Sequence, residues 1–213
     1  MSSVRAYNSP LREEKAHETR EAILAALFEL MDSASTPDEI STEAIARKAG
    51  VQRRTLFRHF ATKDDLLAAF WPWLNARIGV SATPESLNDV VDGPRQAFPQ
   101  FDRHEAAIRA SLHSRTGREM RMGMVANRRA NFARALAPAI ASLPPAEAEK
   151  IEALAHLLYS ASAWEVLKDY GGLTGAQAGE TASWALELIL SAITLGNSPA
   201  DAASHMKETG DED

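Results

Sequence analysis

The sequence contains no cysteine and no long apolar run. Without cysteine in its 213 residues, the chain forms neither disulfide bonds nor thiolate metal sites, which fits a reducing cytosol. No stretch approaches about 18 uninterrupted apolar residues, and residues 1–10 lack the apolar core of a signal peptide. We therefore expect a cytoplasmic protein that neither crosses nor enters a membrane.

Strand patterns are scarce as well. The β-rich stretch at residues 88–92 is too short and too polar at its flanks to anchor a sheet. Apolar residues instead recur at helical spacing along most of the chain, as at Ile23, Leu27 and Leu30. The predicted fold class is all-α, with about nine helices.

Helix start and stop signals are clearest in the first 80 residues. Ser9 followed by Pro10 opens a helix that is expected to reach about Asp32. Ser41 is suited to cap a short second helix, which ends where Gly50 can supply a positive φ. A third helix covers about residues 52–59, and Thr62 caps a fourth, in which we expect Pro72 to cause a kink.

The pattern becomes looser after residue 80. Pro84, Gly93-Pro94 and Pro99 predict short helices and turns. Beyond them, glycine and proline pairs separate longer helices, and the polar end of the chain predicts disorder after Asn197. These longer helices are expected at about residues 101–114, 117–140, 145–170 and 175–196.

Charge is distributed unevenly along the chain. The formal net charge is −6, yet residues 1–80 are neutral and residues 44–63 contain six Lys or Arg and no Asp or Glu. Electrostatic attraction acts over about a Debye length, so a local basic patch on an acidic protein can bind a polyanion. The alternative is an ordinary solvated helix face, which charge alone does not exclude.

The basic stretch lies on two short helices joined by Ala49-Gly50-Val51, which is typical of a helix-turn-helix. On the second helix Leu56 and Phe60 are four residues apart and are expected to face inward. Arginine can bond guanine or phosphate, and a threonine can contact a base edge. The side chains expected to face outward are Arg53, Arg54, Phe57 and Arg58, with Thr55 at the edge.

This region resembles the TetR family of bacterial transcriptional regulators. The resemblance rests on TEAIARKAGV at residues 42–51, RTLFRHF at 54–60 and KDDLL at 63–67, and it covers about residues 16–70. It implies an N-terminal three-helix DNA-binding domain and a C-terminal helical bundle for ligand binding and dimerisation. We therefore expect a DNA-binding domain at 1–62, a connecting helix at 63–80, a ligand and dimer domain at 81–197 and a disordered tail at 198–213.

The resemblance also implies roles for individual residues. Arg53, Arg54 and Thr55 fall where members of the family read bases, and other positions match phosphate contacts. Phe57 replaces a common tyrosine, which removes a phosphate hydroxyl contact, and Gln52 replaces a small capping residue. The predicted DNA-binding residues are Thr42, Gln52, Arg53, Arg54, Thr55, Phe57, Arg58, His59 and Lys63.

Two further sites are predicted in the C-terminal region. Aromatic and methionine side chains form adaptable pocket walls, although each such residue is more often part of a core than of a pocket. Tryptophans and leucines on the last helices suit a dimer interface, which a palindromic operator requires. The expected pocket residues are Trp73, Phe98, Phe101, Ile108, Leu112, His113, Met120, Met124 and Phe132, and the expected interface residues are Leu154, Leu158, Trp164, Trp184 and Leu188.

Catalytic and metal-binding patterns are weak. His104 and His113 fall on opposite sides of a helix, and Glu152 with His156 forms a pair that is expected to face solvent. We predict no enzyme activity, metal or cofactor. The predicted function is a ligand-responsive transcriptional repressor that binds operator DNA as a homodimer and is released by a small-molecule effector. The alternative is a helical small-molecule-binding or interaction module that has kept the fold without specific DNA recognition.

Overall fold

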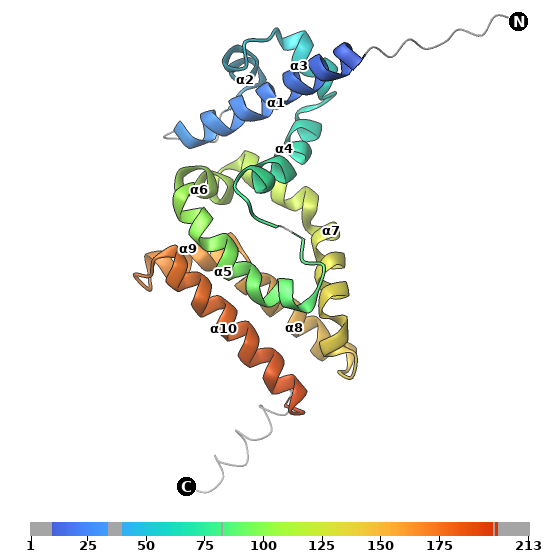
Figure 1. Cartoon of the computed structure of the whole chain (residues 1–213), viewed down its shortest axis with the longest axis vertical. Helices are drawn as coiled ribbons and strands as arrows, with labels where there is room; N and C mark the ends of the chain where they lie inside the picture. The colour runs from blue at the N-terminus through green and yellow to red at the C-terminus, as the bar shows by residue number, and fades with distance from the viewer. Residues whose placement is uncertain (1–9, 34–39, 82, 198, 200–213) are drawn as a thin grey trace, which may run out of the picture. The chain divides into compact units, whose positions relative to one another are not determined.

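The computed structural model describes residues 10–33, 40–81, 83–197 and 199. Over these residues the chain forms ten α-helices, joined by turns and loops, and no strand (Figure 1). The predicted all-α class is therefore confirmed. The helices are α1 (Pro10–Ser33), α2 (Thr42–Lys48), α3 (Arg53–His59), α4 (Lys63–Arg77), α5 (Leu87–Arg103), α6 (Glu105–His113), α7 (Arg115–Ile140), α8 (Pro145–Leu158), α9 (Ala161–Asp169) and α10 (Gly175–Thr194).

The chain divides into two compact units. The first unit contains residues 1–74 and 109–122, and the second contains residues 75–108 and 123–213. Three helices cross from one unit to the other, because α4, α6 and α7 each include a boundary. The predicted break after Asp32 is consistent with the end of α1 at Ser33, whereas Ser9 and the predicted tail at 198–213, apart from residue 199, lie outside the described residues.

The core of the first unit forms where α1, α2 and α3 pack on one another. Ile23 and Leu27 of α1, Ile45 of α2 and Leu56 of α3 are all fully buried. Burying each such side chain contributes about 1.5–3 kcal/mol. The apolar spacing in the sequence therefore corresponds to the buried faces of these short helices, which hold α3 in place.

Helix α5 corrects one prediction. The expected short helices and turns around Gly93, Pro94 and Pro99 are wrong, because α5 runs unbroken from Leu87 to Arg103 and contains both prolines. Its start is fixed by a capping box, in which Ser86 and Asp89 satisfy each other's backbone N–H groups. Gly93 serves close packing rather than a turn, since a Cβ there would collide with the Tyr159 ring.

The predicted helix at 145–170 is two helices. Helix α8 ends at Leu158, and Ser160 then caps α9 by accepting a hydrogen bond from the Ala163 N–H at 3.2 Å. A serine side chain at such a position competes with the backbone hydrogen bonds of a helix, so one helix ends and another begins. The helical spacing of apolar residues continues across this break and does not reveal it. This break accounts for ten helices where the sequence predicts about nine.

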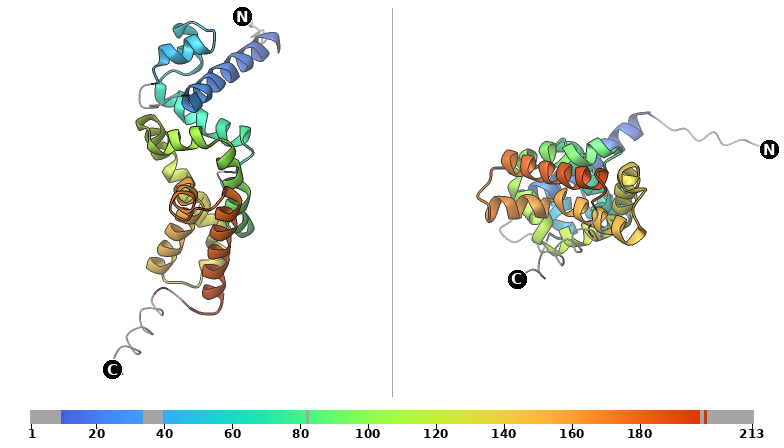
Figure 2. Two further views of the ribbon diagram at one scale, coloured as in Figure 1. Left: turned by 90° about the vertical axis from the view of Figure 1, so that its left-hand side faces the viewer. Right: turned by 90° about the horizontal axis from the view of Figure 1, so that it is seen from below.

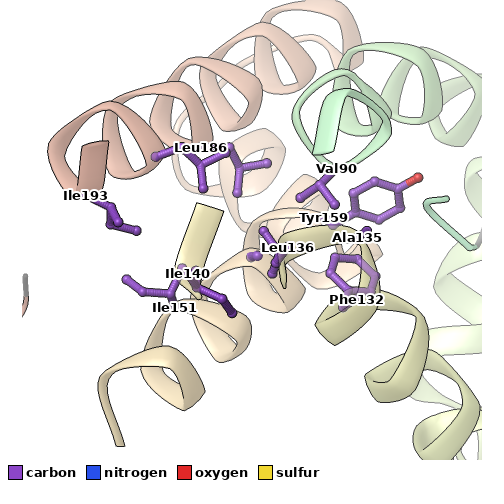
Figure 3. Close-up of a cluster of buried hydrophobic side chains, with 11 residues drawn as sticks. Val90, Phe132, Ala135, Leu136, Ile140, Ile151, Tyr159, Leu186 and Ile193 are labelled. Carbon is purple, nitrogen blue, oxygen red and sulfur yellow. The ribbon is translucent and has the colours of Figure 1, made fainter. Parts of the chain in front are cut away.

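The second unit is organised around α10, which lies beside α5 along most of its length (Figures 1 and 2). Small residues allow this approach. Gly179 of α10 lies so close to α5 that a Cβ atom there would collide with the Pro94 carbonyl oxygen. Figure 3 shows side chains from α5, α7, α8 and α10 pointing toward one another in a buried cluster. Its members are Val90, Phe132, Ala135, Leu136, Ile140, Ile151, Ala155, Tyr159, Leu186, Leu190 and Ile193.

Candidate nucleic-acid interface

The start of α2 follows the predicted capping pattern. Ser41 has extended backbone angles, and its hydroxyl oxygen accepts a hydrogen bond from the Ala44 N–H at 3.1 Å. Thr42 is the first residue of the helix, and its hydroxyl donates to Glu43 Oε2 at 3.2 Å. Thr42 is half-buried, so its hydroxyl lies at the edge of the helix start.

The turn between α2 and α3 is short and well defined. Gly50 has a φ of 68°, a conformation that glycine adopts without strain. The Val51 N–H returns to the Ala46 carbonyl at 2.9 Å and closes the turn. The predicted helix-turn-helix is therefore present, with α3 as its second helix.

Helix α3 has one buried and one exposed face. Leu56 is fully buried and Phe60, the residue that ends the helix, is 2% exposed. Thr55 and Phe57 are half-buried at the edges. The outward face carries three arginines, and all of them are exposed: Arg53, Arg54 and Arg58.

The two ends of α3 are stabilised differently. Gln52 occupies the N-cap position with extended backbone angles but makes no side-chain cap bond, so its exposed amide stays available to a ligand. At the other end Arg20 of α1 donates to the His59 carbonyl at 3.1 Å and lies 4.2 Å from the Phe60 ring centroid. A cation at a helix C-terminus interacts favourably with the helix dipole, so Arg20 helps to hold α3 on α1.

Acidic residues neutralise part of the basic stretch. Lys48 pairs with Glu29 of α1 at 2.8 Å, and Arg53 pairs with Glu43 of α2 at 2.9 Å. Arg54 and Arg58 make no ion pair within the described residues. The positive charge that α3 offers to a polyanion therefore comes first from Arg54 and Arg58, a distinction that the sequence does not show.

His59 is less suited to a phosphate contact than the sequence suggests. Its side chain is half-buried, and its Nε2 atom is covered without a hydrogen-bond partner. Desolvation lowers the pKa of His59, and the positive charges of Arg58 and Arg20 lower it further. The imidazole is therefore neutral at pH 7, and we leave His59 out of the proposed DNA contacts.

Helix α4 begins with Lys63, four residues after the end of α3 at His59. The Asp65 N–H donates to the Thr62 hydroxyl oxygen, and the Thr62 N–H donates to Asp65 Oδ2, both at 3.0 Å. This reciprocal hydrogen bonding confirms that Thr62 caps the fourth helix. Lys63 is thus fixed as the first residue of α4, where it is half-buried.

A comparison with protein families identifies this arrangement. Residues 23–70 match the family described as "Bacterial regulatory proteins, tetR family". This range contains the C-terminal part of α1 from Ile23 onward, the complete helix-turn-helix and the first half of α4. The helix-turn-helix region of the chain is therefore of the TetR type.

Solved structures of similar fold agree with this assignment. NalD, described as the secondary repressor of the MexAB-OprM multidrug efflux pump in Pseudomonas aeruginosa, is 20% identical; the match covers 81% of this chain and 95% of NalD, with a TM-score of 0.57. A tetR-family regulator from Streptomyces coelicolor is 19% identical over 92% of this chain and 90% of its own, with a TM-score of 0.55. A comparison with curated proteins gave no match. At these identities the likeness shows the fold.

The residues expected to line a pocket are divided between the two units of the chain. Trp73, Leu112, His113 and Met120 belong to the first unit, and Phe98, Phe101, Ile108, Met124 and Phe132 belong to the second. In the first unit Trp73 donates its indole N–H to Glu21 at 2.7 Å and stacks on Phe70. In the second unit Phe98 and Phe101 stack at 5.7 Å inside the core. Most of these side chains are therefore core, and His113 is exposed.

A hollow of about 120 Å³ lies between α7 and α8 in the second unit. Phe132 contributes to its wall, and His156 packs edge-on against that ring at 4.2 Å. The expectation that His156 faces solvent is wrong, because the side chain is half-buried and its Nε2 is covered. Desolvation, followed by the charge of Arg128, lowers the pKa of His156. The remaining lining residues are Arg129, Glu149, Glu152 and Ala153.

Tyr159 is a residue that sequence reasoning missed. Its hydroxyl donates to the Ser81 carbonyl at 2.9 Å, and burial raises its pKa to about 12. It also contributes to a second hollow, of about 240 Å³, together with Asp89 and Gly93 of α5. A glycine that faces an aromatic ring from another part of the chain leaves no mark in the sequence, although His156 of α8 and Tyr159, the C-cap residue of that helix, have the i, i+3 spacing of one helix face.

The predicted dimer residues differ in exposure. On α10 Trp184 and Leu188 are 59% and 50% exposed, and on α8 Leu154 is 40% exposed. Leu158 is half-buried against the core cluster. Trp164 is fully buried, and its indole N–H donates to Asp102 at 2.9 Å. Because its side chain is covered within its own chain, we remove Trp164 from the proposed interface.

The described residues contain no group of three or more His, Asp or Glu side chains that could hold a metal ion. Within the same part of the chain, no helix is long and apolar enough to span a bilayer.

Proposed function

We propose that this protein is a transcriptional repressor, not an enzyme, that binds a palindromic operator as a homodimer in the bacterial cytoplasm. The observation that carries this proposal is the exposed face of α3. Its buried residues fix the helix to α1 and α2, while Arg54 and Arg58 point outward without an ion pair in the described residues. Arginine bonds guanine O6 and N7 or phosphate, so this face suits the DNA major groove.

The proposed DNA contacts follow from the exposure of each residue. Arg53, Arg54 and Thr55 would meet base edges, and Thr42, Arg58 and Lys63 would meet phosphates. The exposed amide of Gln52 can bond adenine, and half-buried Phe57 can contact a thymine methyl group. All of these residues except Lys63 lie in the proposed DNA-binding domain, residues 1–62, and Lys63 is the first residue of the proposed connecting helix at 63–80.

Dimerisation is supported by apolar side chains on the second unit. Trp184 and Leu188 lie four residues apart on α10, and Leu154 and Leu157 of the neighbouring α8 are also exposed. Exposed apolar side chains that form a patch mark an interaction surface. We propose that α8 and α10 of two chains form a four-helix interface, so that two copies of α3 reach successive major grooves about 34–36 Å apart.

A small-molecule effector is proposed to bind the second unit, within residues 81–197. The two hollows beside Phe132 and Tyr159 support this, because both combine aromatic walls with polar groups. Helix α4 joins the units as one continuous helix, from Lys63 to Arg77. An effector that favours a conformer with the wrong α3 spacing would release the operator through a coupling of about 1–3 kcal/mol. The fold similarity to NalD, a repressor, supports this direction of control.

Selection from random duplexes tests the proposal. The full chain at moderate salt should enrich a palindromic sequence, and a metabolite screen should then find compounds that release it. A folded dimer that enriches no motif would refute the proposal and favour the alternative, a small-molecule-binding or interaction module without DNA recognition. The pairing of Lys48 and Arg53 with acidic residues gives that alternative its support, because it reduces the free positive charge.

A further inference from the structure

The ion pair between Glu43 and Arg53 connects the two helices of the helix-turn-helix. Arg53 Nε lies 2.9 Å from Glu43 Oε1. The Thr42 hydroxyl donates to the other carboxylate oxygen, Oε2, at 3.2 Å. Both oxygens of Glu43 are therefore engaged, and the carboxylate is fixed near the start of α2.

The Arg53 guanidinium is held from two sides. In addition to the ion pair, its Cζ atom lies 5.3 Å from the centroid of the Phe57 ring, one turn further along α3. A cation over an aromatic face is attracted to it, and an arginine held by a carboxylate and a ring has few rotamers left. Arg53 is thus oriented before any DNA arrives, in contrast to Arg54 and Arg58.

The carboxylate remains charged under physiological conditions. Hydrogen bonds lower the pKa of Glu43, with the backbone bond at its own N–H as the largest cause. The side chains of Glu43 and Arg53 are 57% and 61% exposed, so the pair stands in the same surface that would meet DNA. A negative charge at this place repels phosphates that approach Arg53.

We propose that Glu43 is a specificity-determining residue, which orients Arg53 toward a base and withholds it from phosphates. In a complex with random DNA, a guanidinium that binds phosphate must leave Glu43, and the carboxylate is then left unpaired beside the backbone. In a complex with the operator, Arg53 can bond a base with the nitrogen atoms that do not face Glu43. The pair therefore disfavours random DNA more than operator DNA. This inference rests on the proposed function.

The test compares operator and random duplex binding by wild type and Glu43→Gln. The amide keeps the shape of the side chain but removes its charge. We expect affinity for random duplex to rise about two- to five-fold, the range that exposed ion pairs span. The salt dependence of random binding should become steeper by about one unit, because one more phosphate is neutralised. Operator affinity should change less, so the ratio of operator to random affinity should fall.

The chain provides a matched control in Glu29. This residue also pairs with a cation of α2, Lys48, at 2.8 Å and with similar exposure, but Lys48 lies outside the predicted base-reading set. Glu29→Gln adds the same charge to the same unit, and it should raise operator and random affinities alike. An equal loss of the affinity ratio in Glu29→Gln would mean that overall charge is responsible, which would overturn the inference.

A double-mutant cycle gives the decisive readout. If Glu43 acts through Arg53, then Glu43→Gln should leave the affinity ratio unchanged in an Arg53→Gln background. If Glu43→Gln still lowers the ratio of operator to random affinity in the Arg53→Gln background, the inference is overturned. A wild-type protein that binds all duplexes alike would refute the proposed function as well, whereas a selective wild type that keeps its selectivity in Glu43→Gln would refute the inference alone.

Discussion

Replacing Asp102 by asparagine should destabilise the second unit more than is usual for a partly exposed residue. The Asp102 carboxylate, on α5, is hydrogen-bonded to residues of both α9 and α10. Its Oδ1 atom accepts from the Trp164 indole at 2.9 Å and from Lys168 Nζ at 3.0 Å, and its Oδ2 atom accepts from the Gly175 N–H at 2.7 Å. The side chain of Asp102 is 28% exposed, so water reaches it only in part.

The magnitude follows from these three bonds. A hydrogen bond to a charged group contributes about 1.5–3 kcal/mol, and a neutral one about 0.5–1.5 kcal/mol. If the amide oxygen of asparagine keeps the bonds to Trp164 and Lys168, its NH₂ group faces the Gly175 N–H and leaves that donor unsatisfied. One charged bond is lost and two are weakened, so the free energy of unfolding should fall by about 2–4 kcal/mol. For a chain of this length the midpoint of thermal unfolding should fall by about 5–15 °C.

The loss of stability in Asp102→Asn should be larger at neutral pH than in acid. Burial by itself would raise the pKa of Asp102, but the hydrogen bonds from Gly175, Trp164 and Lys168 outweigh it and lower the pKa. A carboxylate with a lowered pKa in the folded state contributes its stability above the unfolded pKa of about 3.9 and loses it as the pH falls through the folded pKa. The difference in free energy of unfolding between wild type and Asp102→Asn should therefore have its full value at pH 7 and become smaller below about pH 4.

Urea unfolding followed by tryptophan fluorescence measures this difference, at one protein concentration because dimerisation would shift the transition. Asp92→Asn is the matched control on the same helix. Asp92 pairs with Arg95 at 2.6 Å on the surface, and the loss of an exposed pair should cost less than about 1 kcal/mol. A cost for Asp102→Asn that equals that of Asp92→Asn, or that stays constant down to pH 3, would refute the reasoning.

Three other outcomes are expected. Arg54→Ala should change the selected sequence, whereas Lys63→Ala should weaken binding to all duplexes alike and flatten the salt dependence by about one unit; equal losses on operator and random duplex for both variants would contradict this division. Trp184→Glu places a charge in the proposed α8 and α10 interface and should shift sedimentation from dimer to monomer without unfolding the chain; an unchanged sedimentation coefficient would place the dimer contact elsewhere. Gly93→Ala should cost about 1–3 kcal/mol in urea unfolding, because the new Cβ would collide with the Tyr159 ring, and a stability equal to wild type would show that the ring can move.

Much of the DNA-binding region could be predicted because its signals are local. A helix cap such as Ser41 or Thr62 needs only the backbone N–H groups two or three residues away. The turn at Gly50 needs a positive φ that glycine supplies. Leu56 and Phe60 are buried as their spacing predicts. Each of these features is determined within a few residues, so no knowledge of the tertiary fold is required.

The charge of the same region could not be predicted in this way. The uninterrupted basic run at residues 44–63 suggests that every cation is free. Lys48 and Arg53 are paired, however, with carboxylates of α1 and α2. Periodicity shows which face of a helix is exposed, but it does not show which side chain of a neighbouring helix reaches that face.

The second unit shows the same limit more strongly. Proline and glycine predict breaks near Pro94, yet α5 continues because its packing against α10 and Tyr159 stabilises it beyond its own propensity. Trp164 suits an interface by composition, but the tertiary fold buries it beside Asp102. The sequence by itself determined the helical class, the caps and the helix-turn-helix, since these depend on neighbours along the chain. Only the tertiary structure decided which charges pair and which aromatic residues are covered, since those partners lie far away in the sequence.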